Sequence, residues 1–144
     1  TEAEQYALAA ILRPGTAPAS LGAFGLLRRL IRQLRDAFSG ATLRVRLDGG
    51  FAGPTMLTFL EAHGVEYVVG LASNARLEKR AQRLMGKARM RAKASGRTEH
   101  LYGETLYAAK SWEHRRRVII KARIGDKRNF VAVCVPRELR NVQA

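Results

Sequence analysis

The chain has 144 residues, of which 47% are hydrophobic, so it is long enough for one domain with a real core and too short to expect two. Lys and Arg outnumber Asp and Glu by 26 to 12, and the net charge of +14 favours a polyanionic partner, with nucleic acid ahead of an anionic membrane surface. No apolar run approaches about 18 residues and nothing resembles a secretory signal, so we expect no transmembrane span and a cytoplasmic protein.

The first two thirds of the chain alternate between strand and helix patterns. An apolar run over residues 5–12 is typical of a buried strand, although its alanines also allow a helix. Ser20 can cap an amphipathic helix that runs to about Phe38 and carries arginines opposite its apolar face. The later elements are a strand over 43–47, a helix over 54–63, a strand over 65–71 and a basic helix over 75–94. The two later strands are expected to be parallel, because a helix connects them.

The last third has a strand pattern throughout. Four pieces follow Ser95-Gly96, and they cover residues 99–102, 105–110, 117–124 and 129–135, with a turn over 125–128 between the last two. Short connections favour antiparallel pairing. We therefore predict a mixed α/β fold, with an α/β core over residues 1–96 and a β-rich region of the same domain over residues 97–144.

One acidic residue stands at a strand-to-helix junction. Asp48 directly follows the alternating strand over 43–47, and Gly49 and Gly50 behind it allow a sharp turn and close approach of an ion or phosphate. A carboxylate paired with Arg46, or a simple turn residue, explains the same pattern without a function. A metal site needs more carboxylates than this stretch supplies, because hard divalent ions are held by several oxygens.

Basic residues gather on the helix over 75–94 and before the strand over 117–124. The candidates for nucleic-acid contacts are Lys79, Arg80, Arg83, Lys87, Arg115 and Arg116. The four candidates on the helix over 75–94 are explained equally well as an ordinary solvated helix face. Trp112 lies near the other two, and packing is the favoured role for it. His63 and His100 are interpreted as surface residues and Cys134 as a small core residue, so nucleophilic catalysis has no support.

Several motifs together resemble DDE-type transposases of bacterial insertion sequences. They occur in the family's order along nearly the whole chain, and one departure is that Gly49 stands where one branch of the family has a serine. The motifs are Ile11-Leu12-Arg13-Pro14-Gly15-Thr16-Ala17, Arg46-Leu47-Asp48-Gly49-Gly50-Phe51, Glu66-Tyr67-Val68-Val69-Gly70-Leu71 with Asn74, and Ser111-Trp112 before Arg116-Arg117-Val118.

The resemblance implies a ribonuclease-H-like sheet with flanking helices, only part of it within this chain, followed by an antiparallel β-insertion. In such proteins two aspartates and a glutamate hold two Mg²⁺ or Mn²⁺ ions for displacement at phosphorus, and Asp48 matches the second aspartate. The family's first aspartate belongs upstream of Thr1, and Glu138 lacks the Tyr-x-x-Arg-x-x-x-Glu pattern of the glutamate helix.

We therefore expect a central fragment of a DNA transposase catalytic domain, with DNA as partner. The fragment is expected to bind no metal and cleave no DNA by itself, and its open sheet edges favour self-association. The alternative is a non-catalytic basic nucleic-acid-binding module, or a decayed transposase remnant.

Overall fold

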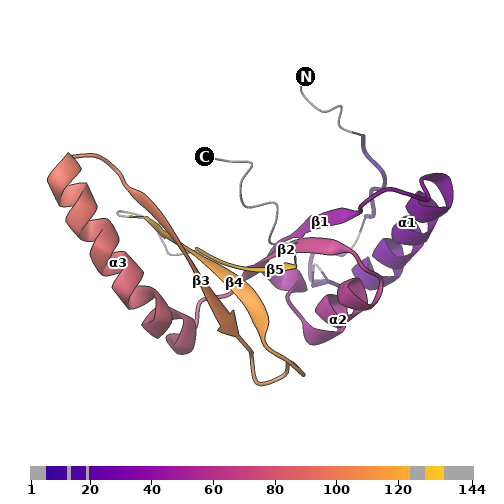
Figure 1. Cartoon of the computed structure of the whole chain (residues 1–144). Coiled ribbons are helices and arrows are strands. Elements are labelled where there is room, and N and C mark those ends of the chain that lie inside the picture. The colour runs from indigo at the N-terminus through magenta and orange to yellow at the C-terminus, as the bar shows by residue number, and fades with distance from the viewer. Residues whose placement is uncertain (1–5, 13, 19, 124–128, 135–144) are drawn as a thin grey trace.

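Five strands form one mixed sheet in the computed structural model, in the order β1-β2-β5-β4-β3 (Figure 1). The structure describes residues 6–12, 14–18 and 20–123, and the backbone of residues 129–134. The elements are α1 (Ala23–Ala37), β1 (Arg44–Leu47), the 3-10 helix η1 (Gly49–Phe51), α2 (Pro54–Ala62), β2 (Glu66–Leu71), α3 (Ala75–Ser95), β3 (His100–Tyr107), β4 (Arg116–Arg123) and β5 (Asn129–Cys134). The mixed α/β class is thereby confirmed.

The pairing joins the two parts of the chain in a single sheet. β1 and β2 are parallel, with Leu47 opposite Val69, which confirms the prediction from their order. β5 lies between β2 and β4 and is antiparallel to both. The C-terminal strands therefore extend the sheet that β1 and β2 begin. The predicted turn over 125–128 and the side chain of Cys134 lie outside the described residues.

Local signals set the ends of α2 and α3. Pro54 occupies the first turn of α2, and Gly64 follows the helix with φ +57°, a conformation that glycine adopts without steric cost. Asn74 caps α3 because its side-chain oxygen accepts hydrogen bonds from the backbone N–H groups of Arg76 and Leu77, at 3.2 and 3.1 Å. Both helices match the prediction closely. None of the described helices is both long and apolar enough to cross a lipid bilayer.

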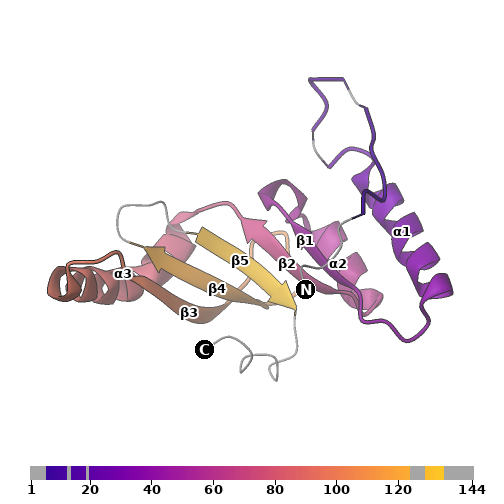
Figure 2. The same cartoon turned by 90° about the horizontal axis from the view of Figure 1, so that it is seen from above.

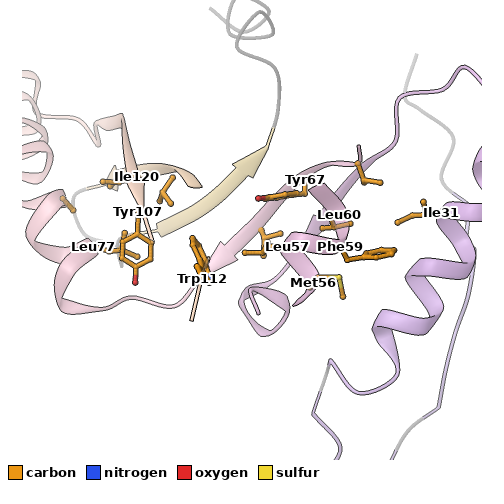
Figure 3. Close-up of a cluster of buried hydrophobic side chains, with 14 residues drawn as sticks. Ile31, Met56, Leu57, Phe59, Leu60, Tyr67, Leu77, Tyr107, Trp112 and Ile120 are labelled. Carbon is orange, nitrogen blue, oxygen red and sulfur yellow. The ribbon is translucent and has the colours of Figure 1, made fainter. Parts of the chain in front are cut away.

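The core lies between one face of the sheet and the helices. Alternate residues of β2 and β4 point into it, and α2 and α3 supply the facing side chains. α1 packs on α2, with the rings of Phe24 and Phe59 edge to face at 4.7 Å. Figure 3 shows the cluster running from the α3 end, through Trp112, to α2 and α1. Its labelled residues are Ile31, Met56, Leu57, Phe59, Leu60, Tyr67, Leu77, Tyr107, Trp112 and Ile120.

The strand expected over residues 5–12 is wrong for the residues that the structure describes. Residues 6–12 form neither strand nor helix and are exposed, Leu12 completely. An apolar run is buried only where another element packs against it, and no described strand pairs with this segment. Ser20 does not cap α1 either, because the helix begins after Gly22 without a side-chain cap. Phe38, which continues the apolar face of the predicted helix, is 61% exposed.

β3 is one strand where the sequence predicted two pieces. Gly103 interrupts the strand pattern, yet it pairs with Ile120 in an unbroken ladder. A Cβ at position 103 would lie 3.1 Å from Cδ2 of Leu84, so the glycine makes room for α3 to pack closely on β3. The break in the pattern therefore marks a helix contact and not a turn.

Candidate functional site

Asp48 lies at the carboxyl end of β1, where the chain leaves the sheet. β2 runs parallel to β1, so both strands end at the same edge of the sheet. This edge is where open α/β sheets place their ligands. Asp48 keeps an extended backbone, with φ −82° and ψ 179°, before the turn of η1 begins. The topology therefore presents the Asp48 carboxylate at an edge suited to a binding site.

A close contact between two backbones fixes the position of Asp48. A Cβ at Gly70 of β2 would lie 3.1 Å from the nitrogen of Gly49 and 3.5 Å from the carbonyl carbon of Asp48. Any larger residue at position 70 would push the Asp48–Gly49 segment away from β2. Sequence reasoning gave Gly70 no such role, although a glycine inside a buried strand is a known sign of close backbone approach.

The Asp48 carboxylate is exposed and only partly engaged. Its Oδ1 accepts a hydrogen bond from the Gly50 N–H at 2.9 Å, so the side chain caps η1. The expected ion pair between Asp48 and Arg46 does not form, and the carboxylate accepts the Gly50 N–H instead. Arg44, on the same strand, pairs instead with Glu66 opposite it on β2. Oδ2 of Asp48 has no hydrogen-bond partner among the described residues, and it is free to contact a ligand.

The described residues supply only part of a site for divalent ions. They contain no group of three His, Cys, Asp or Glu side chains that could hold a metal. Glu61, Glu66 and Glu104 are each engaged in an ion pair with an arginine. Asp48 thus fits one carboxylate ligand of a metal site, and the described residues do not complete a two-ion site around it.

Glu61, which is partly exposed, and the buried Arg116 form an ion pair that joins α2 to β4. Arg116 Nε donates to Glu61 Oε1 at 2.7 Å, and Nη2 donates to Oε2 at 2.9 Å. The hydroxyl of Tyr67 also donates to Oε1, at 2.6 Å, and Nε2 of His114 lies 3.2 Å from Oε2. The Arg116 guanidinium stacks over Trp112, 5.0 Å from the ring centre. This cluster ties α2, β2 and β4 together.

At both groups of this pair, charge interactions and hydrogen bonds shift the pKa in the direction opposite to the effect of burial. Burial alone raises the pKa of Glu61, but the hydrogen bonds from Arg116 and Tyr67 and the nearby positive charges outweigh it, so the pKa lies below its ordinary value. Burial alone lowers the pKa of Arg116, and its hydrogen bond and charge interaction with Glu61 raise it overall. Both groups are therefore held in their charged forms.

The two arginines predicted to contact nucleic acid before β4 have different environments. Arg115 is exposed, whereas Arg116 is 4% exposed and its guanidinium is occupied by Glu61. The structure therefore gives Arg116 a structural contact inside the fold and leaves no surface for a phosphate to reach it. Trp112 packs beside Tyr107 with ring centres 5.6 Å apart, which confirms the packing role favoured for it.

The predicted basic residues of α3 are all exposed. Lys79, Arg83 and Lys87 follow one another at four-residue steps, and Arg91 continues the series, so these four, here called the α3 stripe, share one side of the helix. At 1.5 Å per residue the stripe spans about 18 Å. Arg80 is partly occupied, because its Nη1 donates to Thr105 and to the carbonyl oxygen of Leu106.

The chain matches a known protein family. A family model described as transposase DDE domain group 1 matches residues 2–137. No curated protein matches the chain, and no solved structure does.

Proposed function

The chain belongs to the transposase DDE domain group 1 family, and we propose that it forms the central part of a DNA transposase catalytic domain. The family match covers nearly the whole chain and confirms the resemblance to DDE-type transposases. The ribonuclease-H-like arrangement of the complete domain remains part of this proposal. The parallel pair β1 and β2, with a carboxylate at its carboxyl edge, supports it.

The observation that carries the proposal is the exposed Asp48 carboxylate with one oxygen free. We assign Asp48 as one ligand of Mg²⁺ or Mn²⁺, with the remaining acidic ligands supplied from outside the described residues. When bound, such ions supply charge stabilisation for displacement at phosphorus. Residues of this chain hold Asp48 in place. Gly70 has no side chain and so leaves space for the Asp48–Gly49 backbone, and the Gly50 N–H orients the carboxylate.

Because one acid does not make this site, we expect the purified 144-residue chain to leave plasmid DNA intact in Mg²⁺ or Mn²⁺. Conversion of supercoiled plasmid to the nicked form, followed on an agarose gel, measures this. Nicking by the wild-type chain that disappears in Asp48→Asn would show that the chain completes its own site, and would overturn this part of the proposal.

The α3 stripe is proposed to contact the DNA backbone, because cations at regular spacing on an exposed helix suit phosphates. We expect Arg83→Gln/Lys87→Gln to weaken binding to duplex DNA and to reduce the slope of log affinity against log salt by about 1.8, since each phosphate contact contributes about 0.9. Fluorescence anisotropy at several salt concentrations measures the slope.

The matched control for this experiment is Arg97→Gln/Lys110→Gln, which removes one arginine and one lysine that are exposed outside α3. It changes the net charge by the same amount, so it corrects for the overall attraction of a basic protein to DNA. Equal slopes for the two double variants would contradict a specific role for α3 and leave only the diffuse charge of the chain as the source of binding.

A further inference from the structure

Arginines line an open hollow on α1, far along the chain from the α3 stripe. Its volume is about 790 Å³, and Arg28, Arg29, Arg32 and Arg35 line it together with Gly25, Ile31, Asp36 and His63. We call this feature the α1 hollow. Arg28 and Arg35 follow Phe24 and Ile31 by four residues, so they flank the side of α1 that packs on the core, whereas Arg29 and Arg32 lie further round the helix. Arg28, Arg29 and Arg32 are exposed, so their positive charge faces solvent beside the contact between α1 and α2.

The positive charge of the α1 hollow is largely uncompensated. Among the described residues, no ion pair joins Arg28, Arg29 or Arg32 to a carboxylate. Asp36 is the one acidic residue of the lining, against four arginines. A guanidinium presents several N–H donors in a plane, a geometry that suits phosphate oxygens.

Contacts between α1 and α2 fix the inner wall of the hollow. Arg35 donates to the backbone carbonyl oxygen of His63 at the end of α2. His63 in turn places Nδ1 2.9 Å from the carbonyl oxygen of Phe59, and its ring lies 4.2 Å from the Phe59 ring. These contacts anchor the C-terminal part of α1 to α2, so the other three arginines project from a fixed helix.

The α1 hollow and the α3 stripe lie at opposite ends of the molecule. α1 and α3 flank the sheet from its two ends in Figure 1, and the view turned by 90° in Figure 2 keeps them apart. The core cluster, from Leu77 at one end to Ile31 at the other, fills the space between them (Figure 3). A DNA backbone bound at one basic surface therefore leaves the other surface accessible to a second backbone.

We propose that the α1 hollow is a second DNA-backbone site, which lets one chain hold two separate duplex segments. This inference rests on the proposed DNA-binding function and adds a location and a stoichiometry to it. The contacts are to phosphates, because the lining is rich in guanidinium groups, so binding is salt-dependent and has little sequence preference.

A bridging assay tests the proposal. The 144-residue chain is mixed at low salt with two short duplexes, one carrying biotin and one a fluorophore, and the fluorescence retained on streptavidin is measured. We expect wild-type protein to retain the fluorescent duplex and Arg28→Gln/Arg29→Gln/Arg32→Gln to retain it only at background. The triple variant keeps the α3 stripe, so it still binds a single duplex in an anisotropy titration.

The mass of the complex separates bridging by one chain from bridging by a dimer. Sedimentation is expected to give two duplexes per chain for the wild type and one for the triple variant. A complex of two chains with two duplexes, or unchanged bridging by the triple variant, would overturn the second site. Wild-type binding of one duplex without bridging would overturn it too, and leave the proposed function intact. Failure to bind any duplex would contradict both proposals.

Discussion

Replacing Glu61 with glutamine is expected to lower the free energy of unfolding by about 3–5 kcal/mol, the range for breaking a buried ion pair. The substitution keeps the size of the side chain but removes the charge that faces Arg116, whose side chain is 2% exposed. The Arg116 guanidinium is then left in the core without a counter-charge. Urea unfolding followed by circular dichroism at neutral pH measures the loss.

A second ion pair in the same sheet supplies the control. Glu104 accepts hydrogen bonds from Nε and Nη2 of Arg117 at 3.1 and 2.6 Å, so this pair resembles the Glu61–Arg116 pair in geometry. Its side chains are more exposed, at 36% for Glu104 and 20% for Arg117, against 22% for Glu61 and 2% for Arg116. We expect Glu104→Gln to cost at most about 1 kcal/mol, because water screens exposed pairs. Equal losses for the two variants would show that burial of Arg116 does not determine the effect.

The Glu61–Arg116 pair also predicts how stability depends on pH. The pKa of Glu61 in the folded chain lies below its ordinary value of 4.5, so the unfolded chain binds the proton more readily. The contribution of the pair is therefore complete above about pH 4.5 and is lost as the pH falls through the lower pKa of the folded state. Glu61→Gln is expected to show a flatter decline over this acidic range than the wild type. Parallel curves would contradict a depressed pKa of Glu61.

Local sequence signals predicted the elements whose ends depend on nearby residues. Pro54 and Gly64 bound α2, because each acts on backbone groups within a few residues. Asn74 caps α3 in the same local way, although this role was not assigned to it from the sequence. The parallel pairing of β1 and β2 followed from their connection through α2. The position of β5 between β2 and β4 did not follow, because it depends on pairing between strands far apart in the sequence.

The different environments of neighbouring arginines show where sequence reasoning failed and what could have corrected it. Arg115, Arg116 and Arg117 form one basic cluster in the sequence. In β4, however, Arg116 shares a face with the buried Val118 and Ile120, and Arg117 points to the other face. The period of two along that strand could have placed Arg116 inward. Its partner Glu61 lies on α2, and no local pattern identifies it.

Replacing Asp48 with asparagine is expected to abolish transposition by the full-length protein. Asparagine keeps an oxygen for the Gly50 N–H, so the cap of η1 and the fold are preserved, while the negative charge offered to a cation is lost. Changes to residues that merely support a metal ligand already reduce affinity or activity by about 10–100-fold, so loss of a ligand is expected to exceed 100-fold. An excision assay in cells, with protein levels checked by immunoblot, measures the effect.

Glu113→Gln is the matched control, because Glu113 is also an exposed acid that becomes an amide, and no described contact depends on it. We expect it to retain wild-type excision. If the wild-type protein excises DNA and Asp48→Asn does so equally well, Asp48 is not a metal ligand. If the wild-type protein binds DNA but never excises it, the chain is a non-catalytic remnant, for which the α3 stripe and the α1 hollow are sufficient. A transposase and a non-catalytic remnant would share every basic surface of the chain. The effect on excision of removing the charge at position 48 therefore distinguishes the two functions.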